Sequence, residues 1–112
     1  MTDDTESILW LAVEDYSGLW EAVWELRANH ADMDSEVLLG RAKDELIRLV
    51  GHDLIQLYRC LEPYGDMTDV EKQEAVDLLR MDANWNEPEP GSVSIRFGAT
   101  PAGRAAAGVP EL

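Results

Sequence analysis

The sequence contains a single cysteine, Cys60, among its 112 residues. One thiol excludes an intrachain disulfide and any metal cluster built on several cysteines. The sequence also lacks a glycine-rich phosphate-binding loop, a cysteine pair and a His-Glu-x-x-His pattern, which mark nucleotide, redox and zinc chemistry. No apolar run approaches the ~20 residues that a membrane-spanning helix needs. We therefore expect a protein of a reducing compartment, without a membrane span or a cofactor.

Basic residues are also scarce. Lys and Arg number 9 against 23 Asp and Glu, which makes the formal net charge −14. Residues 1–36 carry ten acids and one base, and residues 61–90 carry nine acids and two bases. The segments 37–60 and 91–112 are nearly neutral. A surface of this sign repels phosphate groups and anionic lipid headgroups, and it favours solubility and basic partners.

The length and the hydrophobic content predict one domain that spans residues 1–112. Hydrophobic residues make up 46% of the chain, which is close to a globular average. A chain of this size buries enough surface for a single core without disulfides. The first residues, Met1-Thr2-Asp3-Asp4, lack the basic start and the apolar run of a signal peptide. Together these features predict a cytoplasmic protein.

Apolar residues at helical spacing predict one long helix over residues 5–28. An ordinary surface helix has one apolar face, whereas this segment has two adjacent apolar stripes. Two stripes predict that the helix makes contacts on two sides. The second stripe contains Trp10, Trp20 and Trp24. Aromatic residues are enriched at subunit interfaces, and packing in the core is the alternative interpretation. The candidate interface residues are Trp10, Trp20, Trp24, Glu14, Glu21 and Glu25.

A second helix is predicted over residues 35–50, begun by Asp34 or Ser35 and ended by Gly51. Its apolar side faces the expected core, and its polar side carries most of the basic residues of this nearly neutral segment. Acids four positions away on the same helix are expected to pair with these bases. The candidate DNA-contacting residues are Arg41, Lys43, Arg48 and Arg59.

Two strands are predicted farther along the chain, over residues 54–61 and 93–97. In the second strand apolar residues alternate with Ser94 and Arg96, which predicts that Arg96 lies on an exposed face. Thr68 and Glu71 form a capping box that predicts a helix over residues 68–81, between the strands. We expect the strands to pair as an antiparallel hairpin. The fold class is then mainly α with a small β hairpin, an α+β protein.

The end of the chain carries a strong helix start. Thr100 is a capping residue, and Pro101 follows at the first helical position. The helix is short and rich in alanine, and residues 105–112 are expected to fray as a tail.

This order of elements resembles that of winged-helix domains. In those domains a helix leads through a Gly-containing turn into the first wing strand, and the second wing strand runs into a short "Leu-Thr-x-x-Gly" helix. Residues 46–58 resemble the first half, and residues 97–104 resemble the second, with Ala99 at the position of the usual Leu. The resemblance implies a winged-helix-like domain with the helix 68–81 inserted in the wing. It looks closest to small uncharacterised bacterial proteins of this type.

A winged-helix DNA reader needs a helix-turn-helix pair before the first wing strand. The sequence offers only one convincing helix there besides the long first one, so DNA binding does not follow from the resemblance. The leading hypothesis is a non-catalytic protein-interaction module, a homodimer through its first helix that engages a protein partner through its acidic faces. The alternatives are a winged-helix transcription regulator that binds DNA and an acidic DNA mimic.

The remaining residues of chemical interest have simple structural interpretations. His30 lies near Asp32 and Asp34 in a polar break, where a solvated loop is favoured over a metal site. Cys60 lies in a predicted strand without a nearby activating His, which favours a buried apolar role. Adjacent carboxylates are expected by chance among so many acids. We therefore predict no catalytic, cofactor-binding or metal-binding residue.

Overall fold

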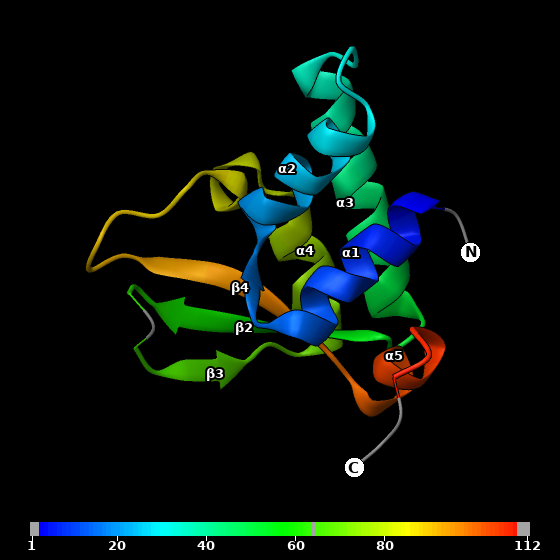
Figure 1. Cartoon of the computed structure of the whole chain (residues 1–112). Coiled ribbons are helices and arrows are strands. Elements are labelled where there is room, and N and C mark those ends of the chain that lie inside the picture. The colour runs from blue at the N-terminus through cyan, green and yellow to red at the C-terminus, as the bar shows by residue number, and fades with distance from the viewer. Residues whose placement is uncertain (1–2, 64, 110–112) are drawn as a thin grey trace.

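The computed structural model describes residues 3–63 and 65–109, and these form a mixed α+β fold with helices against one antiparallel sheet (Figure 1). The predicted fold class is confirmed at this level. In chain order the elements are α1 (Asp3–Glu14), β1 (Ser17–Gly18), α2 (Leu19–Asn29), α3 (Ser35–Gly51), β2 (Ile55–Leu61), β3 (Met67–Asp69), α4 (Lys72–Arg80), the 3-10 turn η1 (Asp82–Trp85), β4 (Val93–Ala99) and α5 (Pro101–Ala106).

The sheet has the strand order β1-β4-β2-β3, and all of its pairs are antiparallel. β2 and β4 pair along their whole length, from Ile55 opposite Ala99 to Leu61 opposite Val93. This pairing confirms the predicted hairpin, and α4 confirms the predicted helix between its strands. The sheet extends beyond the hairpin through the short edge strands β1 and β3, which the sequence patterns did not predict.

The predicted long helix over residues 5–28 is wrong, because the chain breaks into α1 and α2 around β1. Ser17 Oγ donates to the Leu11 carbonyl (3.1 Å) and so satisfies a carbonyl at the end of α1. Gly18 is extended and forms the N-cap of α2, and its N–H donates to Glu21 Oε2 (2.6 Å). Between the helices, Ser17 and Gly18 pair with Phe97 and Arg96 of β4. The break therefore adds a strand to the sheet.

The predicted capping box at Thr68 is also wrong. Thr68 lies in β3, opposite Arg59 of β2, so its backbone continues the sheet. α4 begins four residues later at Lys72, with Glu71 at its N-cap. The pairing of β3 with β2 thus delays the start of the helix.

The core lies between the helices and the face of the sheet that carries Phe97 and Ile95. Both side chains are buried, as predicted for this strand. Val93 was expected on the same buried face, but 61% of it is exposed because it lies at the end of the hairpin. The other large side chains that are fully buried are Ile8, Leu9, Leu19, Leu26, Leu38, Leu46, Leu49, Leu57, Val70 and Leu79.

α5 closes the fold next to the start of β2. Thr100 accepts a hydrogen bond from the Gly103 N–H (3.0 Å), so the predicted cap is confirmed. A Cβ on Gly103 would lie 1.9 Å from the Leu54 carbonyl oxygen, so this contact requires glycine. In the first part of the tail that the sequence predicts to fray, Val109 N–H donates to the Arg104 carbonyl (2.9 Å). Residues 110–112 of that tail lie outside the described residues.

None of the helices in residues 3–63 and 65–109 is long and apolar enough to span a membrane.

Candidate functional site

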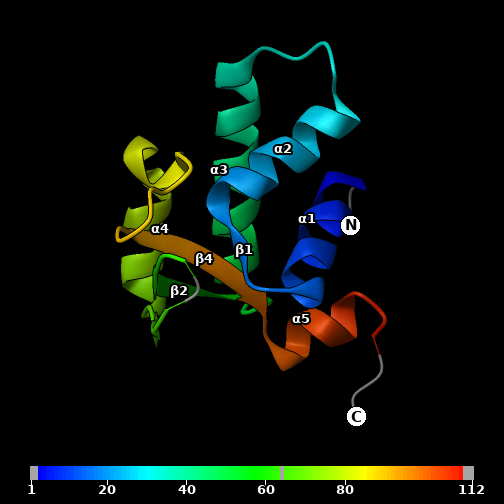
Figure 2. The same cartoon turned by 60° about the vertical axis from the view of Figure 1, so that its left-hand side comes forward.

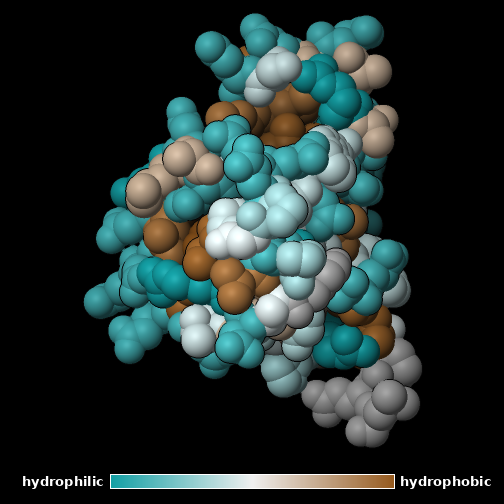
Figure 3. Space-filling model, turned by 90° about the vertical axis from the view of Figure 1, so that its left-hand side faces the viewer, coloured by the Kyte–Doolittle hydropathy of each residue, from teal (hydrophilic) through white to brown (hydrophobic). Residues whose placement is uncertain are grey.

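A groove of about 400 Å³ lies between α2, α3 and the η1 turn. Figure 2 shows α2 and η1 on either side of α3. Figure 3 looks from the side of η1 and the following loop, where brown, apolar side chains are recessed between teal, hydrophilic ones. The groove is lined by Trp20, Val23, Trp24, Ser35, Leu39, Asp82, Ala83, Trp85, Asn86 and Glu87.

Two of the three tryptophans in the groove are held rigidly by the fold. A Cβ on Gly18 would lie only 2.1 Å from the Trp20 ring, so a larger residue at position 18 would displace this ring. The Arg96 guanidinium stacks on the same ring, 5.2 Å from its centroid. Trp85 is buried, and its Nε1 donates to the Leu79 carbonyl (2.9 Å). Trp24, by contrast, is 54% exposed.

The polar residues of the groove are neutral or acidic. Asp82 and Glu87 both come from the segment around η1, and no residue lining the groove, among those that the structure describes, is basic. Lys43 of α3 forms an ion pair with Asp82, which leaves Glu87 without an ion-pair partner in the described part of the chain. The groove therefore combines an aromatic surface with an uncompensated negative charge.

The structure separates the predicted interface tryptophans. Trp20 and Trp24 line this groove, whereas Trp10, which is 45% exposed, lines a smaller pocket between α1 and α5. The homodimer prediction assumed one continuous helix with a double stripe, and that geometric basis is wrong. Trp20 is also only 9% exposed, so most of its surface packs inside the chain and is not available to a second copy.

The predicted interface acids have different environments. Glu14 is exposed at the last residue of α1, and Glu25 is half-buried on α2. Glu21 accepts the Gly18 N–H and so stabilises the start of α2. These three acids do not line the groove. Asp82, Glu87 and Trp85, which do, were not singled out for an interface, because they become neighbours of α2 only in the tertiary structure.

The four candidate DNA-contacting residues all form ion pairs. Arg41 pairs with Asp4 (3.1 Å), and Arg48 pairs with Glu45 (3.3 Å). Lys43 pairs with Asp82, and Arg59 pairs with Glu74. Helical spacing predicted that the bases of α3 pair with acids four positions away on the same helix. Instead, Arg48 pairs with an acid three positions away, and Arg41 and Lys43 pair with acids of α1 and η1.

The buried position of Arg96 corrects the expectation that it lies on an exposed face. Only 5% of the residue is exposed. Its Nε and Nη2 donate to the two oxygens of Glu62 (2.9 and 3.1 Å), and its Nη1 donates to the Tyr16 carbonyl (2.9 Å). Ser94 Oγ donates to the same carboxylate (2.5 Å). Arg96 therefore joins β4 to the segment after β2 and to the residue before β1.

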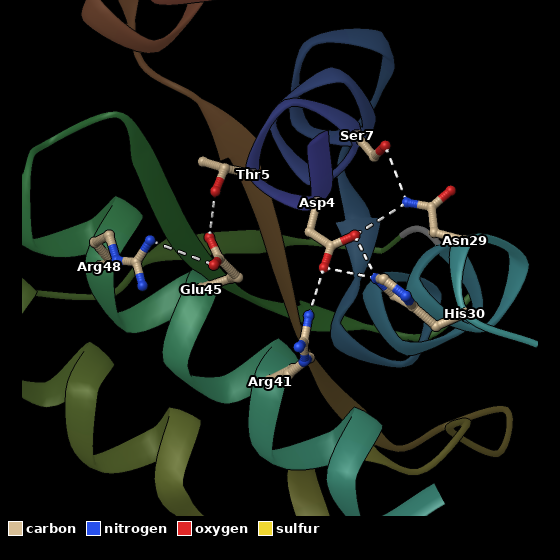
Figure 4. A network of polar contacts seen from close by, with 8 residues as sticks. All are labelled: Asp4, Thr5, Ser7, Asn29, His30, Arg41, Glu45 and Arg48. Carbon is tan, nitrogen blue, oxygen red and sulfur yellow. Dashed lines mark hydrogen bonds and ion pairs between the residues drawn. The ribbon is translucent and has the colours of Figure 1, made fainter. Parts of the chain in front are cut away.

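Asp4 forms the centre of a second polar network, which joins α1 to α2 and α3 (Figure 4). Its two oxygens lie 2.9 Å from His30 Nε2, and Arg41 and Asn29 donate to it (3.1 and 3.4 Å). Burial by itself would raise the pKa of the Asp4 carboxyl, but these hydrogen bonds outweigh burial and hold the pKa below its ordinary value. Beside it, Thr5 Oγ1 donates to Glu45 of α3 (2.6 Å). The network fastens the start of α1 to its neighbours.

We expect an Asp4→Asn variant to lose about 1–3 kcal/mol of stability at neutral pH, because it loses charged hydrogen bonds. The pKa of Asp4 is lower in the folded protein than in the unfolded chain. The stabilisation is therefore complete above the unfolded pKa of about 3.9 and is lost as the pH falls through the lower folded pKa. Urea unfolding at a series of pH values measures this difference. The exposed neighbour Asp3→Asn is the control, and a difference that persists unchanged well below pH ~4 would contradict the assignment.

The other residues of chemical interest lie in ordinary environments. His30 contacts Asp4 and not the Asp32 and Asp34 considered from the sequence. Cys60 is buried in β2, as predicted. In residues 3–63 and 65–109, no group of three or more His, Cys, Asp or Glu side chains lies close enough together to hold a metal ion.

Comparison of the chain with protein-family models, with curated proteins and with solved structures gives no significant match.

Proposed function

We propose that this chain is a non-catalytic protein-interaction module on a winged-helix-like frame, and that its partner is a basic protein. The observation that carries the proposal is the pairing of every candidate DNA-contacting base with a carboxylate, in a chain of net charge −14. Such a surface favours a positively charged protein and opposes a phosphate backbone.

The order of the elements supports the winged-helix-like frame. Three helices, α1, α2 and α3, precede the strand β2, because the predicted long helix divides in two. This division supplies the helix pair, α2 and α3, that the resemblance requires before the first wing strand. β2 and β4 then correspond to the two wing strands, with β3, α4 and η1 inserted between them.

Two features of α3 argue against its use as a DNA-recognition helix. A recognition helix places its outer side chains in the major groove, next to phosphates. One side of α3 is occupied by α4, and Lys43 Nζ on that side lies 3.5 Å from the Arg80 carbonyl. Its exposed surface carries Glu36 and Asp44 together with Arg41 and Arg48, whose charges Asp4 and Glu45 balance. The helix therefore presents no positive surface to DNA.

We expect no measurable binding to mixed genomic DNA fragments at micromolar protein and about 0.15 M salt, because phosphate contacts supply most non-specific affinity.

The partner is sought by affinity purification from the native cell, scored for protein and for nucleic acid. The purified partner should carry net positive charge, bind the chain directly and bind more weakly as salt increases. A DNA-binding protein among such partners would support the DNA-mimic alternative. Sub-micromolar DNA binding, or a purified acidic partner with salt-insensitive affinity, would contradict the proposal.

A further inference from the structure

We infer that the groove between α2, α3 and η1 binds a short peptide segment of the partner that combines an apolar anchor side chain with an arginine or lysine. This inference rests on the proposed function and adds the location of the site and the chemistry of the bound segment.

The walls of the groove suit an apolar anchor. Trp20 and Trp85 are nearly buried and fixed by their contacts with Gly18, Arg96 and the Leu79 carbonyl. A fixed wall loses little conformational freedom when a ligand binds, which increases affinity. Val23 and Leu39 add aliphatic surface, and the volume of about 400 Å³ accommodates a large side chain.

Trp24 is the part of the groove that a partner would cover. More than half of this side chain is exposed, although tryptophan is costly to leave in water and is enriched where proteins bind each other. Trp24 lines the same groove as Trp20 and Trp85, so an anchor side chain bound there lies against aromatic walls.

The charge around the groove selects a basic segment. Glu87 and Asp82 line it, and no described lining residue is basic. A guanidinium or ammonium group binds carboxylates and also stacks on tryptophan faces, as Arg96 already does on Trp20. Because Asp82 is already paired with Lys43, the cationic side chain of the peptide would pair with Glu87 and stack on an aromatic ring.

The same charges disfavour a second copy of the chain in this groove. In a symmetric dimer through this surface, the acidic groove of one copy faces the acidic groove of the other. With a net charge of −14 on each chain, that contact adds like-charge repulsion without a basic partner for Glu87. A basic peptide meets no such repulsion.

The test uses a library of short random peptides displayed on phage and selected on the intact protein. We expect the selected peptides to share an apolar residue next to Arg or Lys. As synthetic peptides, they should bind Trp24→Ala about 30-fold more weakly than wild type, a factor equivalent to 2 kcal/mol. Glu87→Gln should weaken binding about two- to fivefold, as expected for one exposed charge pair.

Matched controls exist on the other side of the molecule. Trp10→Ala removes a tryptophan of similar exposure, and Glu6→Gln removes the same charge as Glu87→Gln, but both residues line the pocket beside α5. Neither control should change peptide affinity. Circular dichroism and urea unfolding of each variant confirm that it is folded.

Several outcomes overturn the inference. The inference is contradicted if no selected peptide binds Trp24→Ala more weakly than wild type. It is also contradicted if Trp10→Ala weakens peptide binding as much as Trp24→Ala does. Self-association that Trp24→Ala abolishes would assign the groove to a second copy. If basic peptides bind wild type and Trp24→Ala equally, the groove is not the binding site, but the proposed basic partner is unaffected. If peptides without basic residues bind in a way that depends on Trp24, both the basic segment inferred for the groove and the proposed basic partner are contradicted.

Discussion

Arg96→Ala is expected to destabilise the protein by about 3–5 kcal/mol, a large part of the 5–15 kcal/mol typical of a small domain. The substitution removes the bidentate contact with Glu62, the bond to the Tyr16 carbonyl and the stacking on Trp20. It leaves the Glu62 carboxylate in a buried position without its guanidinium. Urea unfolding followed by far-ultraviolet circular dichroism measures the loss.

Two further variants separate the loss of a buried charge partner from a general effect of mutation. Arg59→Ala removes a partly exposed arginine that pairs with Glu74, so it should cost about 0–1 kcal/mol. The double variant Glu62→Leu with Arg96→Met removes both buried charges and should recover much of the stability, because apolar replacements of a buried pair are often neutral. If Arg96→Ala is no worse than Arg59→Ala, the buried pair is not important for stability.

Phe97→Ala should cost a similar amount, about 3–5 kcal/mol, for a different reason. Phe97 is fully buried in the centre of β4, opposite Leu57 of β2 and Ser17 of β1. Truncation removes a large apolar surface and leaves a cavity that a close-packed core cannot refill completely. Thermal or urea unfolding of the variant gives the free-energy difference.

Val93→Ala is the matched control for Phe97→Ala. Val93 belongs to the same strand and points to the same side of the sheet, but it is mostly exposed at the end of the hairpin. Its truncation should change stability by no more than about 0.5 kcal/mol. Equal losses at both positions would mean that the register of β4 against β2 is wrong.

Arg96 also shows the limit of reading a strand by alternation. Alternation correctly placed Ile95 and Phe97 on the core side and Ser94 and Arg96 on the other. The inference that the second face is exposed was wrong, because Glu62 and Tyr16 approach it from distant parts of the chain. Periodicity describes only which residues share a face, and it contains no information about what covers that face.

The residue types between α1 and α2 indicate a break in the first predicted helix, although the helical spacing of the apolar residues continues across it. Asp15, Ser17 and Gly18 are residue types that favour turns and helix ends, and their side chains or backbone make local hydrogen bonds here. A strand as short as β1 has no periodicity, and its formation depends on pairing with β4. The apolar residues on both sides belong to two helices, which explains the apparent double stripe.

The sequence by itself determined the α+β class, the antiparallel pairing of the two main strands, the caps at Asp34 and Thr100 and the negative charge. These features depend on local backbone preferences and on composition, which a linear pattern records directly. Only the tertiary structure decided the burial of Arg96 and the formation of the groove. Arg96 and Glu62 are 34 residues apart, and the groove joins α2 and α3 to η1. Such contacts depend on how whole elements pack, and local preferences do not determine that packing.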